Sequence, residues 1–351
     1  MTNYNEILLE NYDYVLPTEL IAQEPLQQRD QSRLMIINRV TDAIEHRYFF
    51  ELPLILQQGD VLVMNNTRVF PARLFAYKEN TGGKVELLLL EEQAPSSEGQ
   101  ERWKAMVKPG KNALPGARLH LNNYLKAEVE KSTEEGNRIL RFYSDKPLKD
   151  WLSQIGNIPL PPYIKEKLND EENYQTIYAK YEGSIAAPTA GFHFTQRLLQ
   201  NLDQAGIERV YLTLHVGSGT FLPVKTQDIR EHRMHYEYFK ISSEAAYRIN
   251  RAREEKRRII AVGTTSCRVL ETMACKDGTV RSGESKTGLF IYPGYNFKII
   301  DGMLTNFHLP RSTLLMLVAA FIGREKILSA YQEAVEKNYR FYSFGDATLL
   351  I

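Results

Sequence analysis

The sequence predicts an α/β main domain with an inserted antiparallel six-stranded β-barrel-like domain. Helix signals and strand signals alternate over residues 1–70 and again over residues 150–351. Between them, six short strand-like stretches follow one another without a helix, and turn residues separate each stretch from the next. Alternation is typical of α/β folds, and closely spaced short strands are typical of a barrel or sandwich. We therefore assign 1–70 and 150–351 to an α/β catalytic domain and 71–149 to the inserted β-barrel domain.

The first α/β segment contains a short helix and two apolar strands. The helix begins at Pro17 and ends before Pro25, because proline is accepted at the start of a helix and stops one elsewhere. Strands are predicted at 34–37 (LMII) and 61–64 (VLVM). A run that is apolar at every position is typical of a strand buried on both faces.

The insertion contains six predicted strands separated by Gly-Gly, Pro-Gly and Asn-Asn pairs, which are typical of turns. The strands cover 72–78, 84–92, 102–109, 117–121, 124–131 and 138–144.

In the second α/β segment, Thr195 and Ser242 or Ser243 are placed to cap helices at 196–204 and 244–257, and Gly206 ends the first of these. Further helices are predicted at 267–274, 313–322 and 325–338, and strands at 209–216, 258–262 and 288–292. The run at 313–322 is apolar, but it is about half of the roughly 20 residues that span a bilayer. We therefore predict a buried core helix there.

Composition and charge exclude several classes of protein. With 43% hydrophobic and 25% charged residues, the chain is neither disordered, nor collagen, nor a coiled coil. Two cysteines without CxxC spacing indicate neither a disulfide framework nor a cysteine zinc site. The net charge of +1 excludes a strongly basic surface overall, although a local RNA-binding patch stays open. The polar N-terminus is unlike a signal peptide, so we expect a soluble cytoplasmic protein without a membrane span.

Three loops contain the candidate chemistry: 186–195, 215–221 and 263–268. Each follows a strand or extended segment and is rich in small or hydroxyl residues, which let a backbone approach a ligand closely. The second contains Gly217-Ser218-Gly219, but the full GxGxxG fingerprint is absent, so a Rossmann dinucleotide site is not supported. The structural alternative for each loop is a tight turn followed by a helix cap.

Histidines gather in polar loops, where they are candidates for general acid–base catalysis. His193, His215 and His308 lie in or beside loops of this kind, and His235 lies in the stretch 231–239. A structural hydrogen-bonding role is the alternative for each. His232 and His235 have HxxH spacing, but nothing in the spacing supplies the further ligands of a metal site, so we expect no metal.

Arginines at loop edges and on one helix form the other candidate cluster. Arg68 follows the second buried strand and Arg73 begins the insertion. The stretch 247–258, which includes most of the helix predicted at 244–257, carries several arginines, among them Arg251 and Arg257. Such a run either contacts RNA phosphates or forms a solvated face.

Long strings in these loops resemble the S-adenosylmethionine:tRNA ribosyltransferase-isomerase family of queuosine biosynthesis. The matching strings include 59–73 (GDVLVMNNTRVFPAR), 186–195 (AAPTAGFHFT), 211–221 (YLTLHVGSGTF), 261–266 (AVGTTS), 301–310 (DGMLTNFHLP) and 343–346 (SFGD). The insertion matches more loosely, mainly through Lys108-Pro109-Gly110, and Phe192 stands where the family usually has leucine.

The resemblance implies an unusual use of S-adenosylmethionine. In this family the ribosyl part is transferred to 7-aminomethyl-7-deazaguanine at the wobble position of tRNA and isomerised, which gives epoxyqueuosine, adenine and methionine. The family is a two-domain protein of an α/β domain and a β-barrel. The resemblance therefore implies S-adenosylmethionine as co-substrate, tRNA as partner, and no metal or separate redox cofactor. We also expect a monomer.

From the resemblance and the loops together, we predict three sets of site residues. The candidates for acid–base catalysis are His193, His215, His235 and His308, with Asp301 to orient one of them or to bind ribose hydroxyls. The candidates for S-adenosylmethionine or its carboxylate are Gly217, Ser218, Gly219, Thr264, Thr265, Ser266 and Arg268. The candidates for tRNA phosphates are Arg68, Arg73, Arg251 and Arg257.

Two alternative functions stay open at this stage. An RNA methyltransferase would use the same co-substrate and release S-adenosylhomocysteine. A non-catalytic tRNA-binding module built around the insertion would bind RNA without turnover. The missing glycine fingerprint disfavours the first, and the histidine loops outside the insertion disfavour the second.

Overall fold

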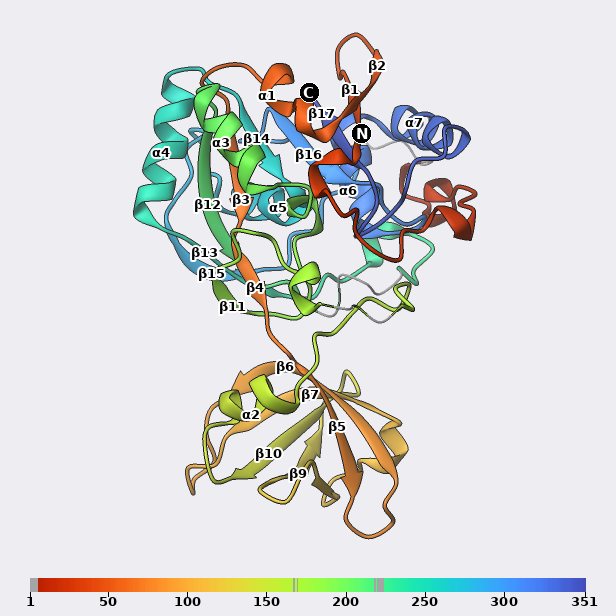
Figure 1. Ribbon diagram of the computed structural model, residues 1–351, viewed down its shortest axis with the longest axis vertical. Helices are drawn as coiled ribbons and strands as arrows, with labels where there is room; N and C mark the ends of the chain where they lie inside the picture. Colours follow the sequence, from red (N-terminus) through yellow and green to blue (C-terminus); the bar gives the residue numbers. More distant parts are fainter. Residues whose placement is uncertain (1–5, 167, 169, 218, 220–223) are drawn as a thin grey trace. The chain divides into compact units, whose positions relative to one another are not determined.

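A nine-stranded mixed sheet forms the centre of the larger of two units in the computed structural model (Figure 1). The structure describes residues 6–166, 168, 170–217, 219 and 224–351. One unit consists of Met1–Arg68 and Pro161–Ile351, and the other consists of Val69–Leu160. The second unit contains the stretch 71–149 that the sequence assigns to the insertion, and it continues through helix α2 (Leu148–Ile155).

Four parallel strands occupy the middle of the sheet. Their order is β12 (Glu208–Leu214), β3 (Val61–Asn65), β14 (Ile259–Val262) and β16 (Gly302–Asn306). On one side β17 (Ala347–Leu350) pairs antiparallel with β16, and β1 (Arg33–Ile37) and β2 (Ile44–Tyr48) follow. On the other side β13 (Glu237–Ile241) and β15 (Gly283–Thr287) extend the sheet in antiparallel fashion. The parallel centre explains why the strand at 61–64 is apolar throughout.

Helices cover both faces of this sheet. Along β3, Val61 and Val63 join one hydrophobic core, whereas Leu62 and Met64 join the other, because successive strand residues point to opposite faces. The first core includes side chains of α4 (Ser243–Glu254), α5 (Gly263–Met273), α6 (Thr313–Ile322) and α7 (Arg324–Glu336). The second includes side chains of α1 (Leu52–Ile55) and α3 (Gln196–Gln204). The larger unit is therefore a three-layer α/β structure, and the predicted fold class is confirmed.

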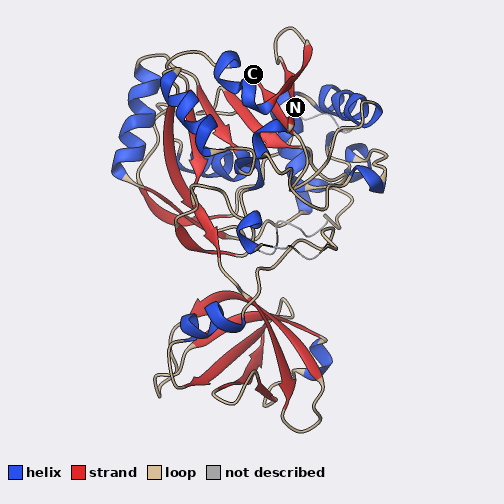
Figure 2. Cartoon of the chain, viewed as in Figure 1, coloured by secondary structure: helices blue, strands red, loops and turns tan. Residues whose placement is uncertain are grey.

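The smaller unit is a closed antiparallel barrel of six strands (Figure 2). Its strands are β5 (Arg73–Lys78), β6 (Lys84–Gln93), β7 (Arg102–Lys108), β8 (Arg118–His120), β9 (Leu125–Ser132) and β10 (Arg138–Ser144). All six predicted strands are present within one or two residues of their predicted ends. Alternate residues such as Leu74, Ala76 and Leu87 are fully buried, as the interior of a small barrel requires.

Short elements complete the chain. Strands β4 (Thr67–Val69) and β11 (Tyr181–Ser184) form a separate two-stranded sheet. Short 3-10 turns cover Leu9–Tyr12, Thr18–Leu20, Arg29–Gln31, Phe49–Glu51, Gly110–Asn112, Glu171–Tyr174, Thr189–Gly191 and Ile229–Glu231. Among the residues that the structure describes, no helix combines the length and apolar character that crossing a bilayer requires.

Three predicted elements are wrong. In place of the short helix predicted between Pro17 and Pro25, Thr18–Leu20 forms a 3-10 turn. Helix α5 begins at Gly263 rather than at 267, because Gly263, at a φ of +83°, turns the chain directly from β14 into the helix. No strand forms at 288–292: the apolar residues there pack against the core as a loop, and the preceding charged segment Gly283–Thr287 forms β15 instead. An apolar run identifies burial more reliably than it identifies a strand.

The predicted caps are confirmed, and one of them gives a clean stability test. The hydroxyl oxygens of Thr195 and Ser242 each accept a hydrogen bond at 3.1 Å from the third backbone N–H of α3 and α4. Ser312 caps α6 in the same way at 3.2 Å. We expect Ser242→Ala to lower the free energy of unfolding by about 1 kcal/mol, because a backbone donor at the start of α4 loses its partner. Urea unfolding measures the change, and Ser242→Asp, which can still cap the helix, should remain near wild type. Equal losses in both variants would contradict the capping role.

Candidate active site

The four parallel strands end at one edge of the sheet, and polar residues gather there. Asn65 ends β3, His215 follows β12, Gly263 follows β14 and Asn306 ends β16. Ligands of open α/β sheets bind outside the carboxyl ends of the parallel strands. This edge is therefore the first place to look for a site.

A cavity lies at this edge, which we call the strand-end pocket. It is lined by the segments 187–190, 263–265 and 305–309, together with Tyr163, Val216, Ser312, Leu314, Tyr342 and Ser343. Two of the three loops predicted from the sequence thus meet around it, and Val216 comes from the third. Its free space is about 80 Å³, whereas cavities that enclose whole small ligands are roughly 300–1,000 Å³. The strand-end pocket can therefore receive one end of a larger molecule.

His308 is the predicted histidine that lines the strand-end pocket. Its Nε2 lies 3.1 Å from Oγ1 of Thr305, and the hydroxyl of Tyr331 lies 3.1 Å from its backbone nitrogen. Burial lowers the pKa of His308 to about 3, because the charged imidazolium would lose its hydration. The ring is therefore neutral at pH 7, and its Nδ1 has no hydrogen bond to any described residue.

His193 lies behind the pocket wall. Its Nδ1 is 2.7 Å from Oγ of Ser32 and its Nε2 is 3.1 Å from Nδ2 of Asn306. Asn306 in turn accepts a hydrogen bond from Thr189 at 2.9 Å, and both of these residues line the pocket. Burial, followed by the charges of Arg340 and Arg29, lowers the pKa of His193 to about 3. His193 thus holds pocket residues in place and does not line the cavity.

The other acid–base candidates lie elsewhere. Nδ1 of His215 is 2.7 Å from Oγ1 of Thr67, and its ring stacks on Tyr238 beside a second cavity. His235 is exposed and packs against Gly219, where a Cβ would lie 2.3 Å from its ring. Asp301 precedes β16 at the opposite end from the pocket, where its Oδ2 accepts a hydrogen bond from the backbone of Ile259 at 2.8 Å. The structure therefore does not bring Asp301 to any of the four histidines.

The predicted S-adenosylmethionine residues divide into two groups. Thr264 and Thr265 line the pocket in the first turn of α5, and Ser266 is fully buried and does not line it. The N-cap of this helix is Val262, whose side chain makes no capping hydrogen bond. Gly217 donates its backbone N–H to Glu237 at 2.9 Å. Gly219 contacts His235 as described above, and Ser218 lies outside the described residues.

Arg268 forms a buried ion pair with Glu237. The side chains are only 5% and 3% exposed, and Arg268 also donates to the backbone oxygen of Leu289 at 2.9 Å. Because Glu237 holds the backbone of Gly217, the pair fixes the loop after β12 to helix α5. The guanidinium of Arg268 is thus engaged inside the protein, away from the strand-end pocket.

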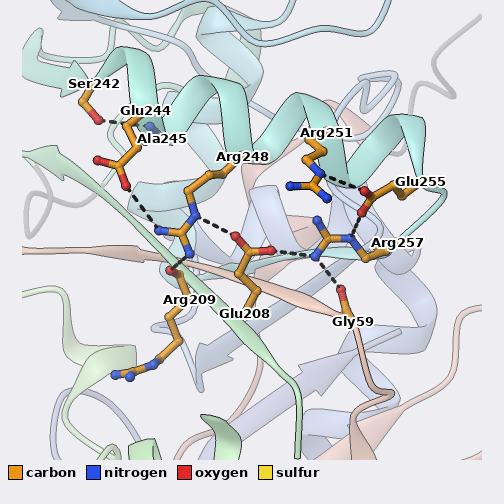
Figure 3. Close-up of polar contacts among 10 residues, drawn as sticks. All are labelled: Gly59, Glu208, Arg209, Ser242, Glu244, Ala245, Arg248, Arg251, Glu255 and Arg257. Atoms are coloured by element: carbon orange, nitrogen blue, oxygen red, sulfur yellow. Dashed lines mark hydrogen bonds and ion pairs between the residues drawn. The ribbon is translucent and has the colours of Figure 1, made fainter.

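Each predicted tRNA-contacting arginine has a carboxylate partner. Arg68 pairs with Glu172, and Arg73 pairs with Glu86 at 2.6 Å. Figure 3 shows the network below α4, in which Arg251 pairs with Glu255 at 2.8 Å and Arg257 pairs with Glu208 at 2.6 Å. Arg257 also donates to the backbone oxygen of Gly59 at 3.2 Å, which anchors the end of α4 to the turn before β3. Arg257 therefore has a structural role, while Arg251 remains largely exposed.

Asn65 and Asn306 were not predicted as site residues. Asn65 donates from Nδ2 to the oxygen of Leu214 and accepts from the nitrogen of Leu214 through Oδ1, both at 3.0 Å. It thereby joins the end of β3 to the end of β12. The sequence signal that could have identified Asn65 is a polar amide directly after a fully apolar strand, because such a residue lies at the carboxyl edge of a parallel sheet.

Within the described ranges, no three His, Cys, Asp or Glu side chains come together as a metal site would require.

The two buried histidines predict a dependence of stability on pH. An unfolded histidine takes up a proton near pH 6.5, but His193 and His308 in the folded protein do so only near pH 3. Between these values the unfolded state binds more protons, so the free energy of unfolding falls as the pH falls. Lowering the pH from 7 to 5 should cost about 2 kcal/mol for each histidine. Urea unfolding across this range measures the slope, and a stability that rises toward pH 5 would contradict it.

Comparison with known proteins identifies the family of the chain. The sequence model of the family described as "Queuosine biosynthesis protein" matches residues 9–350. An S-adenosylmethionine:tRNA ribosyltransferase-isomerase from Desulfitobacterium hafniense is 52% identical, over 98% of this chain and 99% of the relative. One from Natranaerobius thermophilus is 51% identical over 97% and 99%. A crystal structure of S-adenosylmethionine tRNA ribosyltransferase from Thermotoga maritima has 37% identity and a TM-score of 0.55, covering 97% of this chain and all of that one. The resemblance seen in the sequence is confirmed: the chain belongs to the family of queuosine biosynthesis proteins that includes the S-adenosylmethionine:tRNA ribosyltransferase-isomerases.

Proposed function

We propose that the chain transfers the ribosyl moiety of S-adenosylmethionine to 7-aminomethyl-7-deazaguanine at the tRNA wobble position. The ribosyl group is isomerised, which gives epoxyqueuosine and releases adenine and methionine. The observation that carries the proposal is the full-length family match, whose loop strings also line the strand-end pocket. We further propose that the protein works as a cytoplasmic monomer without a metal or separate redox cofactor.

The pocket suits the sulfonium end of S-adenosylmethionine. Because Val262 provides no side-chain cap, the first backbone N–H groups of α5 are available to an anion. We place the methionine carboxylate there, beside Thr264 and Thr265. The neutral ring of His308 does not repel the sulfonium cation. The limited space of the pocket leaves the adenine outside, in a position to depart.

His308 is our candidate for the base that begins the reaction. The sulfonium acidifies the adjacent ribose carbon, and Nδ1 of His308 takes the proton. Adenine then leaves, and the proton returns to it from the imidazolium. The aminomethyl nitrogen attacks the sugar, which rearranges to a carbocyclic epoxide as the C–S bond breaks and methionine leaves. His193 is a positioning residue, since it acts through Asn306.

The product mixture tests the proposal. The purified protein is incubated with S-adenosylmethionine and tRNA that carries 7-aminomethyl-7-deazaguanine, and the small molecules are analysed by mass spectrometry. We expect adenine and methionine to appear in step with epoxyqueuosine. S-adenosylhomocysteine would indicate a methyltransferase instead. Binding of tRNA without turnover would indicate a non-catalytic module.

A further inference from the structure

A second cavity of about 700 Å³ opens along β12 in the larger unit. We call it the tyrosine groove and define it by Tyr178, Tyr181, Tyr211, Tyr238, His215 and Lys180, all of which line it. Its volume falls in the range of sites that enclose a small organic ligand. The reaction outlined above leaves this cavity without a role.

The groove exists because β12 and β13 separate. The two strands pair only at Thr213–Lys240 and Leu214–Phe239, after which β13 ends and Ser242 caps α4. The backbone of Leu212 points toward β3, since its oxygen accepts from Asn66 at 2.9 Å. Backbone groups alternate in direction along a strand, so those of Tyr211 point toward the groove. The backbone N–H and C=O of Tyr211 thus offer one hydrogen-bond donor and one acceptor side by side at the edge of β12.

Another backbone group on this edge of β12, the oxygen of Arg209, already has a hydrogen-bond partner. Nη2 of Arg248 donates to the backbone oxygen of Arg209 at 3.0 Å, and its Nε donates to Glu208 at 2.6 Å (Figure 3). Arg248, which also lines the groove, therefore occupies this part of the strand edge. A donor and acceptor confined to one residue match the polar edge of a single planar base.

Aromatic rings form the walls of the groove. The rings of Tyr178 and Tyr211 lie 5.6 Å apart at 50°, and those of His215 and Tyr238 lie 5.5 Å apart at 19°. Tyr181 is 49% exposed. Exposed aromatic rings are the usual platforms on which the unstacked bases of single-stranded nucleic acids stack.

The charges of the groove favour a phosphate. Nζ of Lys180 lies 5.1 Å from the centre of the Tyr181 ring, and within the described parts of the chain it has no carboxylate partner. Lys240 and Arg248 also line the groove, but both already pair with a carboxylate: Lys240 with Glu284 at 3.3 Å and Arg248 with Glu208 at 2.6 Å. Lys180 is therefore the groove cation that is placed to contact a nucleotide phosphate. A cation beside aromatic rings is the combination that binds the phosphate and the base of a single-stranded nucleotide.

We propose that the tyrosine groove binds one unstacked nucleotide of the tRNA that flanks the reacting base. The base lies among the tyrosine rings with its polar edge on the backbone of Tyr211, and its phosphate contacts Lys180. His215 lines the groove whereas the next residue, Val216, lines the strand-end pocket, so the cavities lie on either side of this stretch. A nucleotide next to the reacting base could therefore occupy the groove while the reacting base lies at the strand-end pocket. The inference rests on the proposed function because it takes tRNA as the substrate.

Variants of the exposed groove residues test the proposal. The affinity of tRNA is measured by fluorescence anisotropy without S-adenosylmethionine. Tyr181→Ala should weaken binding about tenfold or more, since one base loses its stacking partner, and Tyr181→Phe should bind normally. The matched control is Tyr48→Ala, because Tyr48 is also 49% exposed but lies on β2 at the far edge of the sheet. The slope of the logarithm of the binding constant against the logarithm of the salt concentration should fall by about one in Lys180→Ala, because one phosphate contact is lost. The slope should not change in Lys276→Ala, since Lys276 is exposed and does not line the groove.

A fluorescent base analogue identifies the bound nucleotide. Anticodon stem-loops carry 2-aminopurine at each position beside the wobble base in turn, and stacking quenches its fluorescence. We expect quenching at one flanking position with the wild type and its loss in Tyr181→Ala. If the groove variants bind tRNA like Tyr48→Ala, the proposal is wrong. If they raise only the KM for S-adenosylmethionine, its adenosine occupies the groove instead. Product formation by the wild type reports on the proposed function separately.

Discussion

Replacing His308 with alanine should lower kcat by a factor of about 10² to 10⁴, the usual contribution of a positioned acid–base group. His308 lines the strand-end pocket, and burial keeps its ring unprotonated at pH 7, which is the form that acts as a general base. If the residue acts in chemistry, kcat falls and the KM for S-adenosylmethionine changes little. Adenine release over a range of substrate concentrations separates the two constants.

A control variant separates chemistry from folding. His120 lies in the barrel and pairs with Glu79 at its surface, so His120→Ala should leave turnover unchanged. His308→Asn retains a polar side chain beside Thr305 and should remain folded, as thermal unfolding would show, while it loses the base. Near-normal turnover by both His308 variants would remove this residue from the mechanism.

Replacing Arg268 with methionine should lower the free energy of unfolding by about 3–5 kcal/mol. The substitution leaves the carboxylate of Glu237 buried without its cation, which is the costly way to break an internal ion pair. The double variant Arg268→Met/Glu237→Leu should recover much of the loss, because no buried charge remains. It still lacks the acceptor for the backbone N–H of Gly217, so recovery should be incomplete.

Denaturant unfolding of the two single variants and the double variant measures the coupling between the residues. Losses that simply add would show that the two side chains act independently, against the contact described above. Arg248→Met provides a comparison, since its partner Glu208 is more exposed and also pairs with Arg257. Its loss should be smaller because water and a second arginine still stabilise the carboxylate.

Local signals predicted the barrel strands and the longer helices because the physics behind them is local, but they did not predict β2, β13, β15, β16 and β17 of the central sheet. Thr195 and Ser242 cap helices through hydrogen bonds to residues three positions away, so the sequence alone identifies them. The barrel strands were found because turn residues interrupt an alternating pattern. The start of α5 was missed because threonine and glycine are weak helix formers, and tertiary packing overrides that preference at Thr264 and Ser266.

The candidate site could be predicted only in part, because long-range contacts decide which side chains meet. His193 and His308 look alike in sequence, yet only His308 lines the cavity, and an asparagine from β16 separates His193 from it. Arg257 and Arg251 also look alike, but Glu208 engages only Arg257 of the two. No residue spacing encodes these differences, since each depends on a strand or helix distant in the chain.

The barrel has a consequence for the order in which the chain folds. Its first and last segments are joined by paired backbone hydrogen bonds between Arg73 and Asn157, at 3.1 and 2.9 Å. Strand β3 emerges from the ribosome before the barrel, whereas its sheet partners β12 and β14 emerge after it. If the barrel folds first, it brings the two ends of the insertion together. The chain between β3 and its later partner β12 then closes a shorter loop, and pairing the two strands costs less conformational entropy. We therefore expect that an insertion that folds early speeds the pairing of β3 with β12 and β14.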